Sequence, residues 1–163
     1  MLSRCPGCDL RAPDLDGPTH AYIESSPACW AMYGDVLARE YSDPRAFAVH
    51  RLTVDAYAAQ HPGRPSKRSE QSVAVHLIAL QLVLECGHPP AFASRMLARS
   101  VAVGGFVWLE PPSERGTLTV ADVVVAADAT DHAARVERWA RAVYEAWAPH
   151  HAQVRDWAAR CLG

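Results

Sequence analysis

One segment of the chain is apolar on almost every face, and it constrains the fold more than any other feature. Residues 69–86 contain the run VAVHLIALQLVLEC, which is broken by His76 and Gln81 and has Glu85 near its end. A helix that is apolar all round is expected in the middle of a core, and Gly87 is suited to end it. The run is also too short to span a bilayer. It therefore predicts a central helix that neighbouring helices must cover.

Helical patterns lie on both sides of this segment. Ser26 is a good N-cap and Pro27 suits the first helical position that follows it. Apolar residues then recur at three- and four-residue spacing, at Trp30, Tyr33, Leu37 and Tyr41. Together the patterns predict helices over 27–41, 45–60, 69–86, 90–101, 119–127 and 131–160. Pro149 is expected to kink or restart the last of these helices.

Almost no segment alternates as a strand would, so the predicted fold is an all-α, single-domain helical bundle. Its core is expected to be the first three helices and the C-terminal one. The 163 residues suffice for one well-buried core and are few for two ordinary domains. Within residues 1–163 we expect an irregular segment (1–24), a helical core (27–101) and C-terminal helices (119–161). Trp139, Trp147 and Trp157 are expected to pack this core, or a partner if they are exposed.

The charge pattern narrows the classes of partner. Net charge is −2, and the 16 basic residues, 15 of them arginine, are spread along the chain. Binding to nucleic acid needs a concentrated positive face, so no nucleic-acid partner is expected. No membrane partner is expected either, and a protein partner or a small-molecule substrate stays open. The N-terminus lacks the apolar stretch of a secretory signal, which favours a cytoplasmic location.

The sequence CPGC places two cysteines, Cys5 and Cys8, in a segment that has no hydrophobic period. A Cys-x-x-Cys turn presents two thiolates to one metal ion, and the intervening proline and glycine suit the tight knuckle that zinc prefers. Cys29 falls in the first turn of the helix predicted at 27–41, beside this segment, and is the natural third ligand. A redox pair would be expected to follow a strand and open a helix. Zinc is therefore the favoured interpretation, and a redox pair is a distant alternative.

The fourth ligand is left open by the sequence. His20 lies between the two cysteine groups in the irregular segment, where it can reach the metal without constraint, so Cys5, Cys8, Cys29 and His20 form the predicted set. His61 or His76 could replace His20 if the helices bring one of them close. Four protein ligands would make a closed site that stabilises a fold. The predicted function is a zinc-binding structural or interaction module.

Polar residues inside the apolar helices suggest a second interpretation. His50 and His61 lie about 16 Å apart along the helix predicted at 45–60, too far to share one ion. If the helices over 45–60 and 69–86 form a hairpin, Asp55 comes level with His76. Such a pair can be a metal ligand with its partner, an acid–base couple, or a buried histidine that is merely satisfied. The alternative function is a metal-dependent small-molecule enzyme using His76 and Asp55 as catalytic residues, with His50 and His61 as weaker candidates.

Four stretches of the sequence also resemble a known pattern. The chain contains CPGC, SPACW, HRLTVDAYAAQHP and QSVAVHL, and it resembles an uncharacterised bacterial family of small proteins that start with CPGC. The resemblance covers residues 5 to about 86, and the C-terminal half only through its tryptophan-rich helix. It implies a recurring constellation of Cys5, Cys8, Cys29, His50, Asp55, His61 and His76. It implies no particular reaction.

Overall fold

The computed structural model describes residues 1–163, and helices dominate it. In chain order the elements are β1 (Leu2–Arg4), β2 (Arg11–Pro13), α1 (Pro27–Ser42), α2 (Pro44–Phe47), α3 (His50–Gln60), α4 (Lys67–Leu84), α5 (Pro90–Val103), α6 (Val120–Val124), α7 (Ala129–Ala146), the 3₁₀ turn η1 (Ala148–His150) and α8 (His151–Leu162). None of these helices combines the length and the apolar character that crossing a membrane requires.

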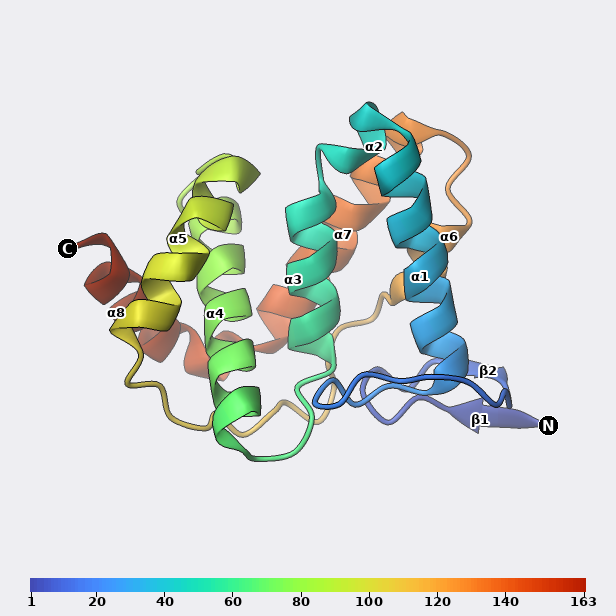
Figure 1. The fold of residues 1–163 in the computed structure, drawn as a ribbon, viewed down its shortest axis with the longest axis horizontal. Helices are drawn as coiled ribbons and strands as arrows, with labels where there is room; N and C mark the ends of the chain where they lie inside the picture. The colour runs from blue at the N-terminus through green and yellow to red at the C-terminus, as the bar shows by residue number, and fades with distance from the viewer.

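Helices α3 and α4 form a hairpin at the centre of the bundle (Figure 1). Helix α7 packs against α3, while α5 and α8 cover α4 on its other side. Helix α1 departs from expectation, because it packs mainly against α2 and α6 and touches α3 only over a short length. The apolar segment predicted to be central is confirmed as the middle of the core.

Most helix starts follow local capping chemistry. The Ser26 hydroxyl accepts a hydrogen bond from the Cys29 backbone N–H at 3.2 Å, which fixes the start of α1. Helix α6 starts with a complete capping box between Thr119 and Asp122. The expected break in the last helix occurs at the 3₁₀ turn that contains Pro149. The helix predicted over 45–60 is instead two helices, α2 and α3, although no glycine or proline marks the break.

The N-terminal segment is less irregular than expected. Strands β1 and β2 pair antiparallel, with Ser3 opposite Ala12, and the CPGC sequence lies in the loop between them. Each strand has three residues, and Ala12 is the only strand residue that is buried. Strands this short show no alternating pattern, which explains why the hairpin was not predicted. The hairpin lies at the base of α1 (Figure 1).

The three tryptophans of the C-terminal helices belong to the core. Trp139 and Trp147 are fully buried, and Trp157 is nearly so. The Trp139 indole N–H donates to the Gln60 side-chain oxygen at 3.0 Å, and the Trp147 indole N–H donates to the Ala59 carbonyl at 3.1 Å. Both bonds hold the C-terminal end of α3, which is followed by His61.

The buried stripe of α1 differs from the one predicted. Tyr41, the last residue of the predicted stripe, is 70% exposed, and the neighbouring Glu40 is buried instead. Besides Ala28, the buried positions of α1 are Cys29, Tyr33, Val36 and Glu40, which recur at helical spacing. A carboxylate thus occupies a core position of this helix, and it must be hydrogen-bonded there.

Candidate metal centre

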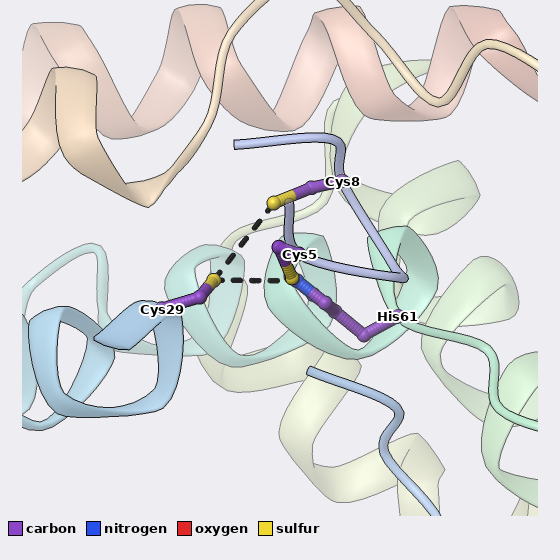
Figure 2. A group of neighbouring side chains, drawn as sticks. All are labelled: Cys5, Cys8, Cys29 and His61. Atoms are coloured by element: carbon purple, nitrogen blue, oxygen red, sulfur yellow. Dashed lines mark hydrogen bonds between the residues drawn. The ribbon is translucent and has the colours of Figure 1, made fainter. Parts of the chain in front are cut away.

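Three cysteines and one histidine meet at the junction of the hairpin with the bundle (Figure 2). Cys5 and Cys8 come from the β1–β2 loop, Cys29 from the first turn of α1, and His61 from the residue that ends α3. One ligand atom from each side chain lies within 4.8 Å of all the others. Segments far apart in the sequence therefore converge on one point. The cluster has the composition Cys3His.

The histidine of this cluster is His61, which corrects the predicted choice of His20. His20 is half-exposed, and its ring packs against Tyr22 and Trp30 at centroid distances of 4.4 and 5.6 Å. The sequence favours His20 because an irregular segment can place its side chains freely. His61, at the C-terminal end of α3, reaches the cysteines instead, with its Nε2 3.5 Å from Cys29 Sγ.

Two of the six distances between ligand atoms match those around a tetrahedral zinc ion. Cys8 Sγ lies 3.8 Å from Cys29 Sγ, and Cys29 Sγ lies 3.5 Å from His61 Nε2. Zinc–sulfur bonds of about 2.3 Å and zinc–nitrogen bonds of about 2.0 Å give tetrahedral edges of roughly 3.8 Å between sulfurs and roughly 3.5 Å between sulfur and nitrogen. The two measured edges agree with these values.

The ring of His61 is oriented by its own helix. Its Nδ1 lies 2.7 Å from the Tyr57 carbonyl, which can only accept, so Nδ1 carries the proton. The Nε2 lone pair is then free to face the cysteines. A partner of this kind on the second ring nitrogen is typical of metal-binding histidines. Tyr57 also stacks on the His61 ring at 4.1 Å and donates its hydroxyl to Cys29 Sγ at 3.5 Å.

The CPGC loop has the hydrogen bonds of a compact knuckle. The Cys5 N–H donates to the Leu10 carbonyl at 2.9 Å, and the Asp9 N–H donates to the Cys5 carbonyl at 3.0 Å. Asp9 takes a left-handed conformation (φ 60°), which aspartate tolerates better than most residues. The Ser26 N–H donates to Cys5 Sγ at 3.4 Å, as backbone amides do toward metal-bound thiolates.

An arginine that is distant in the sequence holds the CPGC loop in place. Arg115 lies between α5 and α6, and its guanidinium donates to the Gly7 carbonyl at 2.7 Å. The Gln60 side chain donates in turn to the Arg115 carbonyl at 2.8 Å. The residue next to His61 is thereby connected to the CPGC loop through Arg115. This arrangement positions the loop against the end of α3.

The three thiols cannot all ionise by themselves. Hydrogen bonds from Cys29 and Cys8 lower the pKa of Cys5 well below its ordinary value. The hydrogen bonds that Cys8 makes to Cys29 and Cys5 raise its pKa, and the hydrogen bond to Cys5 raises the pKa of Cys29 to about 12. Without a metal, these contacts favour ionisation of Cys5 and oppose ionisation of Cys8 and Cys29. A divalent cation would displace the remaining protons, since metal-bound cysteine is deprotonated.

A redox pair is a poorer fit to this geometry. All five cysteines are free. A short strand precedes Cys5, but CPGC leads into β2 and does not open a helix. The helix N-terminus at this site is that of α1, which carries Cys29 and donates the Ser26 N–H to Cys5 Sγ, whereas in a redox motif the Cys-x-x-Cys sequence itself opens the helix. The remaining cysteines, Cys86 and Cys161, have no cysteine neighbour.

The expected meeting of Asp55 and His76 is present across the α3–α4 hairpin. The His76 Nδ1 lies 2.7 Å from Asp55 Oδ1. Asp55 is fully buried, and the Arg51 guanidinium also pairs with both of its oxygens. The i, i+4 spacing of Arg51 and Asp55 was a signal for this ion pair in the sequence. The cysteine cluster includes neither Asp55 nor His76.

His50 belongs to a different group. Its Nδ1 lies 2.6 Å from one oxygen of the buried Glu40, and His132 Nε2 lies 2.9 Å from the other. The Thr53 hydroxyl donates to Glu40 as well. Sequence reasoning missed Glu40, Thr53 and His132, because only the tertiary packing of α1, α3 and α7 brings them together. His50 therefore hydrogen-bonds to neither Asp55 nor the cysteines.

Comparison with known proteins identifies a family and nothing closer. No curated protein and no solved structure matches the chain. Residues 3–148 match a family of unknown function, DUF5946. The match includes the CPGC loop, α1, the α3–α4 hairpin and all of α7, and hence every residue of the Cys3His cluster. The chain belongs to this family of unknown function.

Proposed function

We propose that Cys5, Cys8, Cys29 and His61 hold one zinc ion, and that the ion serves to fasten the N-terminal hairpin to the helical bundle. The observation that carries this proposal is the convergence of three thiols and one oriented imidazole at tetrahedral spacing. Three sulfurs and one nitrogen are a ligand set typical of zinc. Four protein ligands leave no position for water, so the role is structural.

The surroundings explain why a metal is needed there. The hairpin buries a single strand residue, Ala12, so it gains little from apolar burial. The metal ligands Cys5 and Cys29 are fully buried, and the hairpin itself exposes Leu2. A metal bond from this hairpin to α1 and α3 would contribute directly to folding free energy. We infer that the assembled protein is a metal-stabilised structural or interaction module.

Two single substitutions test the ligand set. His61→Ala should lower zinc affinity by more than the roughly 10–100-fold that loss of an outer partner costs, because it removes a ligand. His20→Ala is the matched control and should bind zinc as the unmodified protein does. Competition against a chromophoric chelator measures both affinities. Equal affinities for the two variants, or a larger loss for His20→Ala, would overturn the proposed set.

A second candidate function rests on the Asp55–His76 pair. An open cleft of about 420 Å³ includes His76 in its lining, whereas Asp55 lies buried behind it. A polar cleft that reaches His76 is what an enzyme would need and a sealed core would lack. Asp55 can orient the ring while the other ring nitrogen acts on a substrate. His76→Gln should then preserve folding and zinc content while removing the activity or ligand. If His76 is only structural, the same variant loses stability alone.

A further inference from the structure

The polar side chains that line the cleft beside His76 are all able to donate hydrogen bonds. The lining is formed by Tyr22, Arg68, Gln71, Ser72, Val75 and His76. Every polar side chain in this set can donate a hydrogen bond, and Arg68 carries a permanent positive charge. No carboxylate lines the cleft. Such a lining favours an anionic ligand, because arginine and neutral donors both stabilise negative oxygen atoms.

The proton on His76 is placed by its buried partner. A carboxylate only accepts, so the 2.7 Å contact with Asp55 puts a proton on His76 Nδ1. The charge of Asp55 is already balanced by Arg51, which pairs with both carboxylate oxygens. The pair therefore does not require a second positive charge on His76. In a neutral ring whose proton is on Nδ1, Nε2 carries a lone pair.

That lone pair is available to a ligand. No hydrogen bond within the protein involves His76 Nε2, and this atom is not among the buried polar atoms without a partner. His76 is 15% exposed, and it lines the cleft together with Arg68, which lies two helical turns earlier on α4. The cleft therefore offers a cation and a proton acceptor along one helix face.

We propose that this cleft binds a small anion that also carries a hydroxyl group, with Arg68 pairing the anionic group and His76 Nε2 accepting the hydroxyl proton. Hydrogen phosphate and 2-hydroxycarboxylates have this combination. Sulfate and acetate have the anionic group without the hydroxyl. The inference deepens the second candidate function and is independent of zinc. It assigns the ligand class and the two groups that would contact it.

Two matched pairs of anions test the proposal on the full-length, zinc-loaded protein. Hydrogen phosphate is compared with sulfate, and glycolate with acetate, at pH 8, above the ordinary titration range of histidine. Binding is followed by the ring resonances of His76 and by backbone amide shifts. At least one hydroxylated anion should bind saturably and about tenfold more tightly than its partner. The pair that responds distinguishes a phosphate ligand from a carboxylate ligand.

Three variants assign the contacts. Arg68→Gln should weaken both members of the responding pair by about tenfold or more, whereas Arg99→Gln, on the exposed face of α5, should change neither. His76→Gln should abolish the preference within the pair, as read from amide shifts. The proposal is overturned if none of the four anions binds saturably, if partners bind equally, or if Arg99→Gln matches Arg68→Gln. Zinc content is measured in each sample, so failure here with full zinc leaves the metal proposal standing.

Discussion

Gly7 offers a sharp test of how the CPGC loop meets His61. A Cβ atom built at Gly7 would lie 2.1 Å from His61 Cδ2 and 2.6 Å from the Glu24 carbonyl oxygen, where ordinary contacts begin at 3.4 Å. The shortfall toward the ring is thus 1.3 Å (3.4 less 2.1). Metal–ligand distances tolerate only about 0.2 Å. Gly7→Ala must therefore displace either the His61 ring or the loop that carries Cys5 and Cys8.

The expected loss has two parts. Overpacking a tight contact costs about 1–3 kcal/mol of folding free energy. The displaced ring should also reduce zinc affinity by at least the roughly 10–100-fold that follows loss of an outer partner. Chelator competition measures the affinity, and urea unfolding of the zinc-loaded protein measures the stability. Gly7→Ala should lower both the zinc affinity and the free energy of unfolding.

Gly34→Ala is the matched control for this substitution. Gly34 lies in α1, and a Cβ there meets nothing within 4 Å. Alanine should stabilise that helix by up to about 1 kcal/mol, since glycine is the poorer helix former, and should leave zinc affinity unchanged. Gly7→Ala with zinc affinity within twofold of the unmodified protein would refute the close approach of the loop to His61.

Two further perturbations probe charges outside the metal site. Hydrogen bonds from Arg155 lower the pKa of Glu85 to about 2, so this pair stabilises the fold above the unfolded-state pKa of about 4.5 and the contribution is lost as the pH falls toward 2. Because Arg155 is 56% exposed, the difference in unfolding free energy between the unmodified protein and Glu85→Gln should be only about 1 kcal/mol at pH 6 and vanish near pH 2. Glu40→Leu should cost about 3–5 kcal/mol in urea unfolding at neutral pH, since it leaves the hydrogen-bonding groups of His50 and His132 without their shared partner.

Surface substitutions serve as controls for both. Glu145→Gln removes an exposed carboxylate of α7, and Asp35→Asn one of α1. Each should change the unfolding free energy by no more than about 0.5 kcal/mol. A Glu85→Gln difference that grows as the pH falls would contradict the sign of the Glu85 pKa shift. A Glu40→Leu variant as stable as Asp35→Asn would contradict the hydrogen bonds assigned to Glu40.

Local chemistry made much of the fold predictable from the sequence. Ser26 and Pro27 start α1 as expected, and the apolar run at 69–86 lies in the core. The α3–α4 hairpin follows from two helices joined by a short loop, and with it the pairing of Asp55 with His76. These features depend on helical periodicity and on neighbours along the chain, and both are visible in one sequence.

What the sequence did not predict depends on contacts between distant segments. Glu40 and Tyr41 are adjacent, and only the packing of α1 against α6 decides which of them is buried. Which histidine lies beside the three cysteines, His61 or His20, depends on where the end of α3 lies relative to the CPGC loop. That position is set by bonds such as Trp147 to Ala59, which no spacing rule reveals. The sequence favours His20 as the fourth ligand because it lies in an irregular segment close to the cysteines. In the structure the histidine of the cluster is His61, at the end of a helix.

We propose joint binding of one zinc ion by Cys5, Cys8, Cys29 and His61. Elemental analysis combined with X-ray absorption at the zinc edge tests it most directly, on protein purified without added metal. We expect one zinc per chain, with three sulfurs at about 2.3 Å and one nitrogen at about 2.0 Å. Less than half an equivalent of zinc, or a shell with oxygen in place of one or more of these ligands, would contradict it.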